Sequence, residues 1–159
     1  MSNTRNQPVK GIHHVAILVS DLDRSLRFYR DVLGFDVVDK ADLVTGPEVS
    51  KGVGLADAQL SLVHLKVGDG QTRIELLHYL HPKSRPIADG SQTNDIGVGH
   101  AAFEVTEIKS YYNTLRDKGV RFISKVQESS TGEKFCYFYD PDGAILEIIQ
   151  PPRGKLRSL

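Results

Sequence analysis

The chain has 159 residues, of which 40% are hydrophobic and 25% charged, as expected for a folded soluble protein. Lys plus Arg and Asp plus Glu number 20 each, so the sequence lacks the basic excess of a nucleic-acid or anionic-membrane binder. The single cysteine, Cys136, excludes an internal disulfide and a cysteine-based zinc cluster. Residues 1–11 show no secretory signal, and no apolar run approaches the ~18 residues of a membrane helix. We therefore expect a cytoplasmic protein with one domain spanning residues 1–159.

An internal repeat organises this domain. Residues 14–22 and 100–108 share a pattern of His, an apolar run, a hydroxyl residue, an acid and an apolar residue. The ends of the two units also match, because Ile-Glu-Leu-Leu at 74–77 resembles Leu-Glu-Ile-Ile at 146–149. The repeat predicts two copies of one unit, module one at about 11–80 and module two at about 98–150, joined by a linker over 81–97.

The elements of module one follow in chain order. Branched apolar residues predict a strand over 12–19, and Ser20 or Asp21 can cap a helix that ends at Gly34. We predict three further strands, at about 35–39, 60–67 and 72–79. The stretch 40–58 is weakly periodic and predicts a loop.

Module two repeats this order. A strand that contains His100 precedes a helix capped by Thr106 and ended by Gly119. Three strands follow, at about 121–126, 134–139 and 145–150. The fold class that this pattern predicts is α+β, with two tandem βαβββ modules.

Four residues at equivalent positions of the repeat are candidates for metal binding. His14 shares a strand face with Ala16, and His100 with Ala102, so small neighbours leave room for a ligand. Two glutamates lie between apolar neighbours on strands, where an unpaired carboxylate is costly to bury; they are Glu75 and Glu147. Two imidazoles and two carboxylates suit a divalent transition ion. The remaining histidines, His13, His64, His78 and His81, are interpreted as non-ligands.

At these residues the chain resembles the vicinal oxygen chelate superfamily, which includes glyoxalases, bleomycin-resistance proteins and extradiol dioxygenases. The resemblance covers most of residues 11–150 and rests on segments that include 12–17, 21–26, 28–35, 99–105 and 139–147. It implies paired βαβββ modules whose mixed sheets curl around a metal-binding cavity. It also implies that His14, Glu75, His100 and Glu147 hold one divalent ion, which could be Zn, Ni, Co, Mn or Fe(II).

The local sequence after Glu75 is similar to that of methylmalonyl-CoA epimerases and cyclitol epimerases. The function that this implies is a metal-dependent isomerase or epimerase that abstracts a proton α to a carbonyl of a small chelating substrate. The alternatives are a glyoxalase I-type lyase, an extradiol-type dioxygenase and a non-catalytic ligand-binding homologue. Four ligand positions disfavour the dioxygenase, which typically uses two His and one carboxylate, and the binding homologue, which lacks the metal set.

The resemblance implies that Glu75 or Glu147 doubles as the catalytic base. Acyl-CoA epimerases commonly carry a second catalytic Glu in the loop before the third strand, but Ser50 stands at that position here. Glu48 lies two residues away and is the candidate second base. Because family members are often dimers and sheet edges need cover, we predict a homodimer, without a nucleic-acid or membrane partner.

Overall fold

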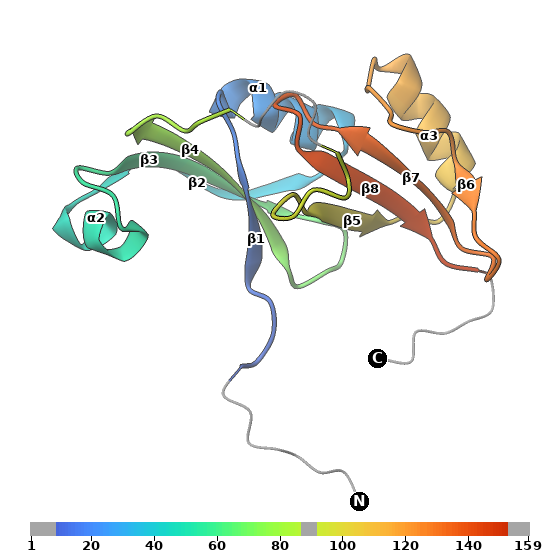
Figure 1. Cartoon of the computed structure of the whole chain (residues 1–159), viewed down its shortest axis with the longest axis horizontal. Helices are drawn as coiled ribbons and strands as arrows, with labels where there is room; N and C mark the ends of the chain where they lie inside the picture. Colours follow the sequence, from blue (N-terminus) through green and yellow to red (C-terminus); the bar gives the residue numbers. More distant parts are fainter. Residues whose placement is uncertain (1–8, 87–91, 153–159) are drawn as a thin grey trace, which may run out of the picture.

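The structure is a computed structural model that describes residues 9–86 and 92–152, and it contains two four-stranded mixed sheets (Figure 1). The first sheet has the order β1-β4-β3-β2, and the second has the order β5-β8-β7-β6. Each sheet comes from one half of the chain, as the repeat predicts, so the α+β architecture of two tandem modules is confirmed.

Module one begins with β1 (His14–Leu18) and α1 (Leu22–Arg27), which continues into a π-helical turn, η1 (Phe28–Val32). Asp21 caps α1, since its Oδ1 accepts a hydrogen bond of 2.9 Å from the amide of Arg24. The module then runs through β2 (Asp36–Thr45), α2 (Pro47–Val53), β3 (Gln59–Lys66) and β4 (Arg73–His81).

The predicted loop over 40–58 is wrong. β2 continues to Thr45, with irregularities in its pairing to β3, and α2 occupies 47–53. Pro47 opens this helix at a position where its missing N–H costs nothing, and Gly54 ends it with a φ of +72°.

Module two contains β5 (His100–Glu104), α3 (Ile108–Asp117), β6 (Gln127–Glu128), β7 (Lys134–Tyr139) and β8 (Ile145–Gln150). Two predictions are wrong here. The strand expected over 121–126 is replaced by a single bridge from Phe122 to Phe138, and the paired residues lie later, in β6. The residue before α3 is Glu107 rather than Thr106, and the amide of Ile108 donates to the side chain of Gln150 instead.

The hydrophobic core lies between the helices and one face of each sheet. In Figure 1, α1 and α3 both lie in the upper part of the molecule. Val63 and Leu76 of the first sheet and Phe138 and Leu146 of the second belong to the same buried cluster as Leu115 of α3. No helix in the described part of the chain is long and apolar enough to cross a membrane.

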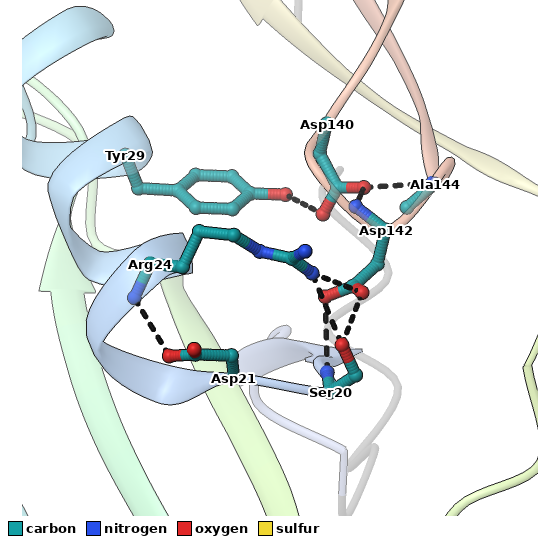
Figure 2. A network of polar contacts seen from close by, with 7 residues as sticks. All are labelled: Ser20, Asp21, Arg24, Tyr29, Asp140, Asp142 and Ala144. Carbon is teal, nitrogen blue, oxygen red and sulfur yellow. Dashed lines mark hydrogen bonds and ion pairs between the residues drawn. The ribbon is translucent and has the colours of Figure 1, made fainter.

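A buried hydrogen bond also joins the modules (Figure 2). The Tyr29 hydroxyl donates to Asp140 over 3.0 Å, and Asp140 also accepts from the amides of Asp142 and Ala144. Burial raises the pKa of Asp140 above its ordinary value, although these three hydrogen bonds oppose the rise. Burial and the charge of Asp140 raise the pKa of Tyr29 well above its ordinary value, so the phenol keeps its proton.

Asp142 extends this contact to the start of α1 (Figure 2). Its carboxylate accepts from the amide of Ser20 over 2.9 Å and from the Ser20 hydroxyl over 2.6 Å, and it forms an ion pair with Arg24. Partial burial raises the pKa of Asp142, but the hydrogen bonds from Ser20 and Arg24 and the charge of Arg24 outweigh it and hold this pKa below its ordinary value. The turn at 140–143 therefore fixes module two against module one.

Candidate metal centre

In module one, β1 and β4 bring a histidine and a glutamate together. The two strands run parallel, with Ala16 opposite Glu75, and His14 lies two residues before Ala16 on the same face. His14 Nε2 is 3.6 Å from Glu75 Oε2. Glu75 is only 9% exposed, whereas His14 is exposed, so the pair lies at an open sheet surface with its carboxylate largely withdrawn from water.

Module two repeats this arrangement at the same register. Ala102 of β5 lies opposite Glu147 of β8, and His100 lies two residues before Ala102. His100 Nε2 is 3.0 Å from Glu147 Oε2, and Glu147 is 7% exposed. The repeat found in the sequence therefore places an equivalent His–Glu pair on each sheet.

The first sheet adds a histidine that the sequence interpretation treated as a non-ligand. His64 of β3 lies opposite Glu75, with Nε2 at 3.0 Å from Glu75 Oε1. Its other ring nitrogen, Nδ1, lies 2.7 Å from Asp39 Oδ1 of β2. The alternating pattern of β3 carries no sign of this role, and only the pairing of β3 with β4 places the imidazole beside Glu75.

The corresponding neighbour in module two is a tyrosine. Tyr137 of β7 lies opposite Glu147 and donates a hydrogen bond to it. Burial, the charge of Glu147 and this hydrogen bond raise the pKa of Tyr137, so the phenol keeps its proton near neutral pH. Burial and the charge of Glu147 raise the pKa of the neighbouring Cys136 to about 12, which makes its thiol a poor nucleophile.

The two His–Glu pairs do not converge on one point within the described chain. In residues 9–86 and 92–152, one group of three or more His, Cys, Asp or Glu side chains has ligand atoms within 4.8 Å of one another. That group is His14, His64 and Glu75, without His100 and Glu147. The structure therefore holds the four predicted ligands as two separate pairs.

Glu48 lies apart from both pairs. It is exposed on α2, which follows β2. The last residue of β2, Thr45, pairs with Gln59 of β3, and Gln59 pairs with His81 at the end of β4. His81 is six residues beyond Glu75 on β4, about 20 Å of extended strand. In the same helix the Ser50 hydroxyl accepts a 3.0 Å hydrogen bond from the amide of Ala58 and thereby holds the loop before β3.

A cavity of about 600 Å³ lies beside the second pair. It is lined by β1 from Val15 to Leu18, by the start of β5 with His100, and by the turn that ends at Ile145, so it separates the edge strands of the two sheets. A volume of this size accommodates a small organic ligand.

The donor atoms around Glu75 fit a divalent transition ion. Imidazole nitrogens and carboxylate oxygens bind such ions, and a ligand histidine usually hydrogen-bonds through its second ring nitrogen. His64 Nδ1 contacts Asp39, and His14 Nδ1 contacts His13 Nδ1 at 2.8 Å. Both rings therefore turn Nε2 toward Glu75, and this is the arrangement that an ion requires.

Comparison with known proteins identifies the family. Residues 11–148 match the Glyoxalase/Bleomycin resistance protein/Dioxygenase superfamily. The chain belongs to this superfamily. Its members include epimerases and lactoylglutathione lyases, so the resemblance seen in the sequence is confirmed at this level.

Two relatives and one solved structure show how far the similarity extends. A probable lactoylglutathione lyase from Synechocystis sp. is 32% identical over 145 residues, 89% of this chain and 96% of the relative. The mitochondrial methylmalonyl-CoA epimerase of Homo sapiens is 32% identical over 143 residues, 87% of this chain and 73% of the relative. A glyoxalase family protein from Bacillus cereus superposes with a TM-score of 0.81 over 96% of this chain and 99% of its own, at 21% identity, which supports the fold.

Proposed function

We propose that this protein is a divalent-metal-dependent isomerase or epimerase that removes a proton from the carbon next to a carbonyl group. The observation that carries the proposal is the His–Glu pair at the same register in both modules, Ala16 opposite Glu75 and Ala102 opposite Glu147. Burying each carboxylate without a cation costs free energy, and one metal ion bound to both glutamates removes this cost for both.

The four ligands would meet when module one of one copy faces module two of a second copy. Within one chain the pairs are separate, and each lies on the sheet face away from the shared core. On β1 that face carries His14, Ala16 and Leu18, all exposed, whereas Ile17 points into the core. A twofold dimer would cover these faces and create two equivalent four-ligand sites.

These residues would have two tasks in the reaction, which are to hold the ion and to move the proton. His14, Glu75, His100 and Glu147 would hold a divalent ion, which when bound would supply positive charge beside the oxygen of the substrate carbonyl. Glu147 or Glu75 would take the proton from the α-carbon and return it. The sheet surface around Ala16 and Ala102 would leave room for the substrate beside these carboxylates.

The names of the two relatives point to one substrate class. Methylmalonyl-CoA and lactoylglutathione are both thioesters with a hydrogen on the α-carbon. That carbon also carries a carboxylate in methylmalonyl-CoA and a hydroxyl in lactoylglutathione, so the same metal and base could act on either. The similarity to the Synechocystis relative keeps a lyase as the second candidate function.

The test is proton exchange in deuterium oxide. The metal-loaded protein is incubated separately with methylmalonyl-CoA and with lactoylglutathione, and deuterium at the α-carbon is measured by NMR. Exchange that depends on metal supports the proposal, and lactoylglutathione as the better substrate favours the lyase. No metal-dependent exchange with either thioester contradicts the proposed reaction for this substrate class.

A further inference from the structure

We infer that His64 is a third metal ligand in module one, so that it joins His14 and Glu75 in binding the divalent ion in each chain. This inference rests on the proposed metal-dependent function and changes its ligand set. The three side chains come from β1, β3 and β4, and their ligand atoms lie within 4.8 Å of one another.

The hydrogen bonds of His64 place a lone pair toward Glu75. Asp39 can only accept when it is ionised, so the 2.7 Å contact makes His64 Nδ1 the donor, and Nε2 of the neutral ring then carries a lone pair. Nε2 faces Glu75 Oε1 at 3.0 Å, and an ionised carboxylate also offers only lone pairs. Two acceptors at this distance attract each other only with a proton or a metal ion between them.

His14 favours the metal ion over the proton. Its Nε2 faces the other oxygen of the same carboxylate, Glu75 Oε2, at 3.6 Å. Its Nδ1 is in contact with His13, which leaves Nε2 for an ion. A single proton gives only one of the two imidazoles a favourable contact with Glu75. An ion between the three residues is bound by both imidazoles and by the carboxylate.

Module two provides an internal comparison. The position opposite Glu147 holds Tyr137, whose hydroxyl donates to the carboxylate and supplies a proton donor where module one has a nitrogen lone pair. Module two then offers two donors, His100 and Glu147, and module one offers three. We therefore expect the ion to bind first and more tightly to module one.

The experiment titrates Co²⁺ into the full-length protein and counts the exchangeable imidazole N–H resonances that the bound ion shifts in the proton NMR spectrum. The variants are His64→Ala, His64→Phe and His100→Ala. The Phe variant keeps a ring at this position without a nitrogen. The matched control is His78→Ala, because His78 is three residues after Glu75 and lies on the other face of β4.

Both His64 variants should lose one shifted resonance that His78→Ala retains. Their Co²⁺ affinity should fall by more than the roughly 10- to 100-fold that losing a hydrogen-bonding partner of a ligand costs. Retention of every shifted resonance in both His64 variants overturns the inference, whatever the affinity. If His100→Ala still loses one, the four-ligand proposal stands without His64. If neither position affects the spectrum, both fail.

Discussion

The two modules present the same pair of residues in different surroundings. His14 with Glu75 and His100 with Glu147 occupy matching registers, and each glutamate is less than a tenth exposed. The neighbour on the next strand differs, because Glu75 faces an imidazole whereas Glu147 faces a phenol. The shared register of the two modules therefore fixes where the carboxylates lie. The residue on the next strand decides whether each carboxylate faces a nitrogen lone pair or a proton donor.

The largest effect is expected from removing one histidine of either pair. His14→Ala and His100→Ala should each lower metal affinity and proton exchange by about 100-fold or more, since losing even a hydrogen-bonding partner of a ligand costs roughly 10- to 100-fold. The fold should remain, because both side chains are exposed. Metal content by atomic absorption and secondary structure by circular dichroism check this, and full metal occupancy in His100→Ala contradicts the ligand assignment.

Glu147→Gln should reduce metal binding and exchange more than Glu48→Gln does. The amide keeps the shape and one oxygen of the buried carboxylate but loses its charge, whereas Glu48 is exposed on a helix away from both pairs. The comparison is made by metal titration and by deuterium exchange on the same samples. Parent-like behaviour of Glu147→Gln would reduce Glu147 to a strand residue and end the four-ligand account.

Asp142→Asn should lower the free energy of unfolding by about 2 kcal/mol at neutral pH, because it weakens hydrogen bonds to a charged group between the modules. The pKa of Asp142 is lower in the folded protein, so its ionised form stabilises the fold above its ordinary pKa. That contribution is lost as the pH falls through the lowered value. Urea unfolding of variant and parent at pH 7 and at progressively lower pH should therefore converge in acid, and an equal difference at every pH contradicts the assignment.

The smallest effect is expected from Tyr137→Phe, which removes the hydroxyl beside Glu147 and keeps the ring. Metal affinity should fall by about 10-fold, the low end for the loss of a ligand's hydrogen-bonding partner. Tyr139→Phe is the control, since Tyr139 follows on the same strand and packs under Arg121 instead. An equal effect of the two substitutions would show that Tyr137 has no particular role.

Much of the fold was predictable because the same pattern of elements occurs in both modules. Local patterns predict the four strands that carry the two His–Glu pairs. They also predict the helix ends at Gly34 and Gly119, where φ is positive. The missed helix α2 had clear local markers in Pro47 and Gly54, but its short apolar pattern gave no periodicity to detect. The missed half of β2 contains Lys40 and Asp42, whose charges hide the alternation of an edge strand.

The candidate site was predictable only in part, for a physical reason. The match of Glu75 with Glu147 is visible along the chain, but the match of His64 with Tyr137 depends on which residues face each other across β3–β4 and β7–β8. The separation of the two pairs depends on how the sheets pack, and a repeat does not contain that information.

The proposed assembly of each site from two copies has a direct test. His14→Ala and His100→Ala proteins are mixed in equal amounts, allowed to exchange subunits, and assayed for metal-dependent proton exchange. In a mixed dimer one site would carry both substitutions and the other none, so random exchange should restore about one quarter of the parent activity. If each site instead lies within one chain, every site in the mixture lacks one histidine, and activity that stays at the level of the separate variants contradicts the account.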